Sequence, residues 1–275
     1  SFIILFFVGI MDDIMVLRAY KKLVAQILVS ALMVIGSDVR IRSLFGLFGV
    51  YEINYYVSIL FSIMTFIILI NAFNLIDGID GLAGSYTVVT SALFGISFFR
   101  LGSNNDPLVI LCAIIIAASI AFLIYNLSNK RSNKIFMGDT GSMILGFLLA
   151  FTGISFIDIF IEKRDEVFYH LQTAPVIAVA ILILPIVDTI TVIITRIYHG
   201  KSVLSADKNH IHHKLLNLGL THRRSTAYII LYFLFVITVT YFSRHLDVNH
   251  LLVGVMALGF LGAYLPIVLL KFKKD

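Results

Sequence analysis

The sequence predicts an all-α protein that crosses a membrane many times. Of its 275 residues, 59% are hydrophobic and only 13% are charged, about half the charged fraction of a soluble domain. The mean hydropathy is +0.98. The apolar residues are gathered in runs close to the roughly 20 residues that a helix needs to cross about 30 Å of hydrocarbon. These observations predict a polytopic helical bundle.

Nine apolar runs are the expected membrane segments. Seven are long: 53–76, 81–99, 107–129, 140–157, 167–187, 225–243 and 248–270. The run 23–37 needs its flanking residues to span, and the run 1–11 looks cut off. The first residues have no positive n-region and no cleavage site, so we expect a fragment that lacks earlier helices. Residues 1–275 are thus predicted to form one N-terminally truncated membrane domain.

The distribution of charge predicts the orientation. Nine crossings place five segments on one side: 11–22, 72–81, 128–139, 196–225 and the C-terminal end. This side holds 15 of the 21 Lys and Arg residues, and the positive-inside rule makes it cytoplasmic. The net charge of +5 is then a topology signal, so no nucleic-acid partner is expected.

Three acidic motifs lie on this side, each at the border of an apolar run. Asp12 and Asp13 end the first run, Asp77 and Asp80 follow the run 53–76, and Asp139 precedes the run 140–157. Asp77 and Asp80 share a helix face, where their like charges repel and a hard cation such as Mg²⁺ relieves the repulsion. The plain alternatives are a solvated helix end, a glycine turn and a helix N-cap, respectively.

A fourth polar cluster lies in the long loop 196–225. His210, His212 and His213 stand there among Lys and Arg, which favours phosphate or nucleotide contact over a zinc site. Asp188 lies in the preceding span, about two turns before Arg196. An intramembrane carboxylate is functional by default, and a structural hydrogen-bonding role is equally open.

In this order, the motifs resemble those of the bacterial polyprenyl-phosphate N-acetylhexosamine-1-phosphate transferases, relatives of the phospho-MurNAc-pentapeptide translocase. The resemblance covers essentially the whole chain and rests on Asp12-Asp13 with Leu17, Lys22 and Gln26, Asn71 through Gly81, Phe136 through Ser142, Pro185 through Thr189, and Ala206 through His213. The sequence His-Ile-His-His is similar to the N-acetylglucosamine-1-phosphate branch. One departure is the segment Leu127 to Asn133, which is longer than in the family and lacks its proline.

The resemblance implies a role for each matching residue. Asp139 matches the family's magnesium ligand, with Asp13 and Asp77 as further metal ligands and Mn²⁺ as an alternative ion. Asp12, Asp13, Asp77 and Asp80 match catalytic acidic residues. The implied substrate-binding residues are Lys22, Asn74, Gly78, Asn126, Phe136, Arg196, His210, His212 and His213.

The resemblance also implies a reaction. N-acetylhexosamine-1-phosphate, in the first place GlcNAc-1-phosphate, passes from a UDP-sugar to undecaprenyl phosphate, and UMP is released. The expected place is the cytoplasmic face of the bacterial inner membrane, at the first lipid-linked step of envelope polysaccharide synthesis. The alternatives are a MurNAc-pentapeptide-like specificity and a non-enzymatic polyprenyl or ion transporter. A homodimer is left open.

Overall fold

The computed structural model describes residues 2–162, 172–200 and 210–272. Helices dominate this part of the chain, as the composition predicts. The helices, in order, are α1 (Phe2–Met15), α2 (Ala19–Gly36), α3 (Tyr55–Ile76), α4 (Leu82–Arg100), α5 (Asp106–Asn126), α6 (Gly138–Glu162), α7 (Ala174–Ile181), α8 (Ile183–Tyr198), α9 (Ile211–Asn217), α10 (His222–Phe242) and α11 (Val248–Phe272). Two short 3-10 turns, Ser103–Asn105 and Arg131–Asn133, precede α5 and α6.

Seven of the described helices are long and apolar enough to cross a membrane: α2, α3, α4, α5 with its preceding turn, α6, α10 and α11. They correspond to seven of the predicted runs. The short α1 has 14 residues, which extend about 21 Å at 1.5 Å per residue and do not reach across the hydrocarbon core. The prediction of an all-α polytopic bundle is confirmed.

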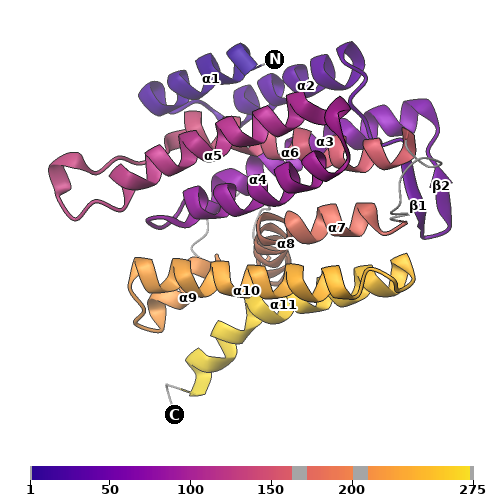
Figure 1. Ribbon diagram of the computed structural model, residues 1–275. Coiled ribbons are helices and arrows are strands. Elements are labelled where there is room, and N and C mark those ends of the chain that lie inside the picture. Colours follow the sequence, from indigo (N-terminus) through magenta and orange to yellow (C-terminus); the bar gives the residue numbers. More distant parts are fainter. Residues whose placement is uncertain (1, 163–171, 201–209, 273–275) are drawn as a thin grey trace.

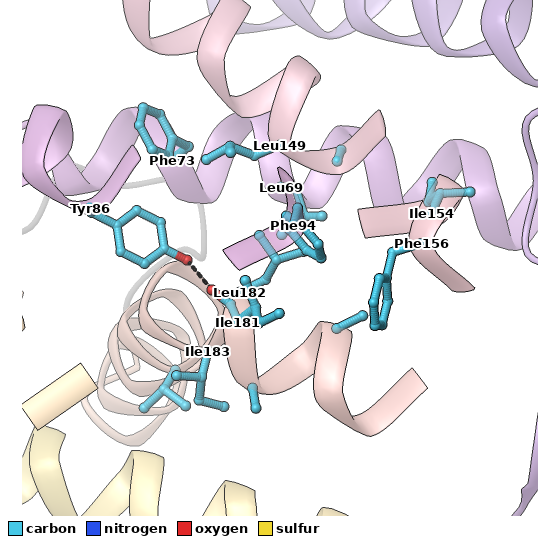
Figure 2. Close-up of a cluster of buried hydrophobic side chains, with 14 of the residues drawn as sticks. Leu69, Phe73, Tyr86, Phe94, Leu149, Ile154, Phe156, Ile181, Leu182 and Ile183 are labelled. Carbon is cyan, nitrogen blue, oxygen red and sulfur yellow. Dashed lines mark hydrogen bonds between the residues drawn. The ribbon is translucent and has the colours of Figure 1, made fainter. Parts of the chain in front are cut away.

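The predicted span 167–187 differs from the structure. Its described part consists of two helices, α7 and α8, bent by 73° at Leu182. The hydroxyl of Tyr86 in α4 donates to the carbonyl oxygen of Ile181 at 2.9 Å, which satisfies a backbone group that the break leaves without a helical partner (Figure 2). Helix α8 also continues to Tyr198, well beyond the predicted end. Hydropathy alone does not reveal such a break.

Close packing brings α1 onto the start of α6. A side chain at Gly9 would place its Cβ 2.5 Å from the Cα of Thr140, so only glycine allows the two backbones to approach this closely. Helix α6 also packs along α3, and α2 packs against α3. These contacts place the ends of four helices next to one another.

The opposite end of the bundle carries a small hairpin between the predicted runs 23–37 and 53–76. Strands β1 (Ser43–Leu47) and β2 (Val50–Glu52) pair antiparallel. In Figure 1 this hairpin lies at the right, while the α5–α6 connection, α9 and the start of α10 lie at the left. The motifs that contain Asp12, Asp80 and Asp139 lie with these elements, since Lys22 joins Asp12 to Asp139 and Asp80 pairs with Lys134 and His222. We name this end the polar end.

Candidate functional site

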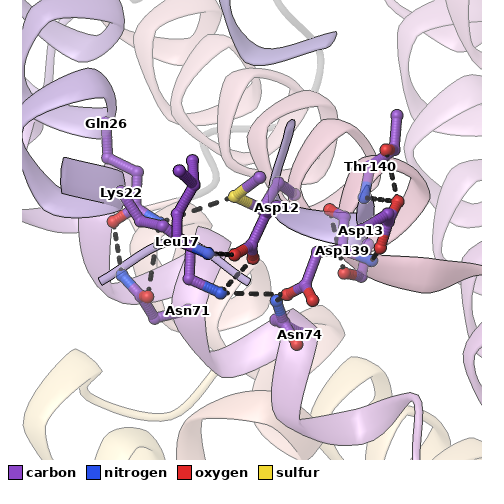
Figure 3. Close-up of polar contacts among 11 residues, drawn as sticks. Asp12, Asp13, Leu17, Lys22, Gln26, Asn71, Asn74, Asp139 and Thr140 are labelled. Carbon is purple, nitrogen blue, oxygen red and sulfur yellow. Dashed lines mark hydrogen bonds and ion pairs between the residues drawn. The ribbon is translucent and has the colours of Figure 1, made fainter. Parts of the chain in front are cut away.

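Lys22 is the cation at the centre of the polar end. Its Nζ donates to the Asp12 carboxylate and lies 3.2 Å from Asp139 Oδ1 (Figure 3). Asp12 is only 4% exposed, and its other oxygen accepts from the Leu17 N–H at 2.7 Å. Lys22 therefore connects the first turn of α2 to the end of α1 and the start of α6.

Asn74 holds Asp139 from the α3 side. Its Nδ2 donates to Asp139 Oδ1 at 2.5 Å. About one turn earlier, Asn71 and Gln26 exchange two hydrogen bonds of 2.7 and 3.3 Å, which fix α3 against α2. Within the described part of the chain, Asp139 Oδ2 accepts no hydrogen bond, so this oxygen is available to a ligand.

Asp13 caps α6. Its two oxygens accept from the backbone N–H groups of Asp139 at 2.7 Å and Thr140 at 3.1 Å, and from the Thr140 hydroxyl at 2.5 Å. A carboxylate is favoured there because the first N–H groups of a helix have no helical partner. The helix N-cap foreseen near Asp139 thus exists, but Asp13 supplies it from another helix.

Asp77 is the unpaired carboxylate of the site. It lies just after α3, and among the described residues its side chain makes no hydrogen bond or ion pair. Burial raises its pKa to about 6, and the nearby carboxylates of Asp139 and Asp80 add to this shift. The Asp77 carboxylate therefore lies close enough to those of Asp139 and Asp80 to be repelled by both.

Asp80 is paired by residues that the sequence did not single out. Lys134 Nζ lies 2.5 Å from Asp80 Oδ2, and His222 Nδ1 lies 3.2 Å from the same oxygen. Thr226 donates to the Asp80 carbonyl at 2.9 Å. The turn after α3 is thereby attached to the start of α10 and to the connection before α6.

Asn126, predicted to bind substrate, serves as a clamp in this structure. It is buried, and its Oδ1 accepts from the Gly81 N–H at 2.6 Å while its Nδ2 donates to the Ile135 carbonyl at 2.9 Å. Gly81 has a φ of +81°, which favours glycine at this start of α4. Any substrate contact by Asn126 would be additional to these two bonds.

The histidine segment begins at the polar end, but residues 201–209 of its loop lie outside the described residues. His212 is 2% exposed, and its Nε2 has no hydrogen-bond partner in the described part. A side chain at Gly78 would place its Cβ 2.0 Å from this nitrogen, so His212 faces the turn that carries Asp77. The ring of His213 lies 4.3 Å from that of His212.

Burial lowers the pKa of His212 to about 4, with the neighbouring His213 as the next cause. The imidazole is therefore neutral at pH 7. A neutral imidazole can form a hydrogen bond with the sugar-donor substrate, but it does not contribute a positive charge.

Two further predicted residues differ in exposure. Phe136 is 74% exposed. Lys134 Nζ lies 5.7 Å from the centroid of its ring. Such a ring is free to stack on a base. Arg196 is instead buried in the last turn of α8.

The described residues contain no group of three His, Cys, Asp or Glu side chains that could hold a metal ion by themselves. Magnesium in phosphate-transfer sites is commonly held by one or two carboxylates together with substrate phosphates and water. Asp139 and Asp77 fit that pattern, because one has a free oxygen and the other has no partner. Asp13 fits less well, since both of its oxygens accept hydrogen bonds from α6.

Sequence reasoning missed Lys134 and His222. Their partner, Asp80, is 54 positions from Lys134 and 142 from His222. For Lys134 the sequence did carry a signal, because this lysine stands two residues before Phe136, at the start of the motif that contains Asp139.

The sequence is similar to those of known proteins. The profile of glycosyl transferase family 4 matches residues 1–157. The undecaprenyl-phosphate alpha-N-acetylglucosaminyl 1-phosphate transferase of Yersinia pestis is 33% identical over 233 residues, which are 83% of this chain and 60% of that protein. The decaprenyl-phosphate N-acetylglucosaminephosphotransferase of Mycolicibacterium smegmatis is 30% identical over 240 residues, 82% of this chain and 57% of that protein.

The chain spans about 60% of the length of the curated relatives that it matches. The family profile covers more than half of the chain, including the motifs of Asp12, Asp77 and Asp139. On these grounds the chain belongs to glycosyl transferase family 4.

Proposed function

We propose that the protein transfers N-acetylglucosamine-1-phosphate from UDP-N-acetylglucosamine to undecaprenyl phosphate and releases UMP. The names of the two relatives describe N-acetylglucosamine phosphate transfer to a polyprenyl phosphate. The observation that carries the proposal is the arrangement around Asp139, which is bonded to the Lys22 ammonium and lies near the unpaired Asp77 carboxylate. A site of this kind accommodates both phosphate oxygens and a divalent cation.

In the proposed reaction, an oxygen of the lipid phosphate attacks the β-phosphorus of the UDP-sugar. The bond from that phosphorus to the bridging oxygen breaks, and UMP leaves with the electron pair. Phosphoryl transfer depends mainly on positioning and on neutralising charge. Lys22 offers its ammonium to the phosphate oxygens, while Asp12 orients that ammonium. Because both Asp12 oxygens accept hydrogen bonds, orientation is favoured over proton abstraction.

Asp139 and Asp77 are the residues proposed to hold Mg²⁺, with Mn²⁺ as the alternative. The ion would offset the charge of the diphosphate and of the departing UMP. Asn74 fixes Asp139 Oδ1 and leaves Oδ2 for the cation. Phe136 is proposed to stack on the uracil, and His212 to hydrogen-bond the donor next to Gly78.

The polar end is proposed to face the cytoplasm of a bacterial inner membrane, as the distribution of Lys and Arg favours. Labelling with a membrane-impermeant thiol reagent tests this orientation. Phe136→Cys should be protected in intact cells and Phe48→Cys, on the exposed hairpin, should react. The native Cys112 is buried and gives a low background. The opposite labelling pattern would contradict the orientation.

The transporter alternative has one observation in its favour, the broken helix α7–α8, because transporters often bind substrate at such breaks. The break here is surrounded by apolar side chains and the Tyr86 hydroxyl (Figure 2). The carboxylates Asp12, Asp77 and Asp139 lie instead at helix ends, and both oxygens of Asp188, within α8, are bonded to His210 and Ile211; this favours the enzyme.

The test is UMP release by the purified full-length protein with undecaprenyl phosphate and a panel of UDP-sugars that includes UDP-MurNAc-pentapeptide. We expect UDP-N-acetylglucosamine to give UMP and a lipid-linked sugar diphosphate only when Mg²⁺ or Mn²⁺ is present. Asp139→Asn should lower activity by at least about 100-fold, because it removes a carboxylate proposed to hold the cation. Each 1.36 kcal/mol of lost transition-state stabilisation corresponds to a tenfold loss in rate. Folded wild-type protein that releases no UMP from any donor would refute the proposal.

A further inference from the structure

Asp188 connects the broken helix to the histidine segment. It lies in α8, six positions beyond the break at Leu182, and it is 3% exposed. Its Oδ2 lies 2.8 Å from His210 Nδ1, and its Oδ1 accepts from the Ile211 N–H at 2.8 Å. Both carboxylate oxygens therefore hold the residues at which α9 begins.

These contacts fix the orientation of His210. A carboxylate facing Nδ1 places a proton on that nitrogen and holds the ring in one rotamer, as second-shell carboxylates do for histidines elsewhere. The ring of His210 is parallel to that of His212, with an interplanar angle of 4° and centroids 5.6 Å apart. The orientation of His210 thus limits where His212 can lie.

His212 has a buried ring nitrogen without a hydrogen-bond partner among the described residues. This nitrogen, Nε2, faces Gly78. A buried polar atom without a partner destabilises the fold, so such an atom in a binding site indicates a partner supplied by the ligand. The absence of a side chain at Gly78 leaves space for the imidazole, since a Cβ there would collide with it.

We infer that Asp188 is a positioning residue, which holds His210 and the start of α9 so that His212 Nε2 meets a diphosphate oxygen of the donor beside Gly78. This inference rests on the proposed transfer reaction. Asp188 does not touch the donor, and its effect passes through His212.

A double-mutant cycle tests this connection. The variants are Asp188→Asn, His212→Ala and the two combined, and the measured quantities are kcat and KM for UDP-N-acetylglucosamine. Asp188→Asn keeps an oxygen for the Ile211 N–H but directs an amide at His210. We expect it to raise KM about tenfold, and we expect the double variant to have the KM of His212→Ala alone, because coupled residues are not additive.

The matched control is Asp158→Asn, the same substitution at the opposite end of the bundle, where Asp158 is paired with Arg42. Its KM should equal that of the wild type. KM does not depend on the amount of folded enzyme, so a partly unfolded Asp188→Asn preparation still gives an answer. An unchanged KM in Asp188→Asn, or effects of Asp188→Asn and His212→Ala that multiply, would overturn the inference.

The outcome separates this inference from the proposed function. If the wild type and Asp158→Asn release no UMP, the proposed function fails. If both are active and Asp188→Asn shares their KM, only the role of Asp188 fails.

Discussion

The two ends of the bundle both gather charged side chains, but they balance the charges differently. At the hairpin end, Arg40 and Arg42 donate to Asp38, and Arg42 also holds both oxygens of Asp158 at 3.0 and 2.9 Å. The bonds from Arg40 and then Arg42 keep the pKa of Asp38 below its usual value. At the polar end, burial and two neighbouring carboxylates raise the pKa of Asp77 to about 6.

This difference separates structure from function. A carboxylate whose charge is fully paired stabilises the fold, whereas a carboxylate held among like charges destabilises it. Uncompensated charge of this kind is typical of sites that await a cation or a substrate. The comparison therefore predicts that substitutions at the polar end change catalysis, and that equivalent substitutions at the hairpin end change only stability.

The largest effect is expected for Asp77→Asn. Loss of a proposed cation ligand should lower turnover by about 100- to 1,000-fold, or roughly 3–4 kcal/mol of transition-state stabilisation. Initial rates of UMP release at saturating UDP-N-acetylglucosamine measure this effect. Asp38→Asn, the same change at the hairpin end, is the control and should stay within twofold of the wild type. Equal rates for the two variants would remove the distinction between the ends.

Gly78→Ala should have the next largest effect. The added Cβ would lie 2.0 Å from His212 Nε2, so the turn or the imidazole must move, at a cost of about 1–3 kcal/mol. We expect kcat/KM to fall about 10- to 100-fold. Gly254→Ala in α11, where nothing lies within 4 Å of an added Cβ, is the matched control and should be silent. In a His212→Ala background, Gly78→Ala should cause no further loss, because the clash is then removed. A further fall in kcat/KM in that background would show that the clash is not the cause.

Phe136→Ala should act on donor binding alone. Loss of a stacking ring costs about 1–3 kcal/mol per base, so KM for the UDP-sugar should rise about tenfold while the melting temperature stays constant. Phe99→Ala provides the comparison, because Phe99 is equally exposed at 73% but lies at the hairpin end of α4. A KM that rises equally in both variants would argue against uracil stacking.

Asp77→Asn should also change stability, with a sign opposite to its effect on activity. In metal-free protein at pH 7 the variant should be more stable than the wild type, since it removes a disfavoured charge. The folded pKa of about 6 lies above the unfolded value of 3.8, so the folded wild type gains stability as pH falls through 6. The difference between the variants should therefore shrink toward pH 4, as thermal unfolding in EDTA will measure. A wild type that is the more stable at pH 7 would contradict the repulsion.

The smallest functional effect is expected for Asp158→Asn. This change breaks a partly buried pair with Arg42 and should lower the free energy of unfolding by about 1 kcal/mol. Chemical denaturation in detergent measures the loss, and UMP release should be unaffected. A substantial fall in turnover would show that the hairpin end communicates with the site.

The sequence predicted most of the helices because apolar runs of this length are typical of membrane-spanning helices. It missed the bend at Leu182, since the residues on both sides of the break are apolar and the stabilising Tyr86 hydroxyl comes from another helix. It also missed the hairpin, which depends on positive φ angles at Gly46 and Gly49 rather than on an alternating pattern.

The sequence predicted which side chains gather at the site only where they belong to short motifs at the ends of apolar runs. Asp77 and Asp139 were assigned to one border from loop topology, and the structure brings them within electrostatic reach. The capping role of Asp13 and the pairing of Asp80 with Lys134 depend on contacts between distant segments. Such contacts follow from helix packing, which spacing along one chain does not specify.

The amide of Asn126 has a consequence for how this protein can vary. By binding Gly81 on one side and the Ile135 carbonyl on the other, it closes the connection between α5 and Phe136 at its base. Residues can be added or removed within 130–133 at little cost, because the entropy of a loop rises only slowly with its length. The same place would therefore accept an engineered epitope without displacing the aromatic ring.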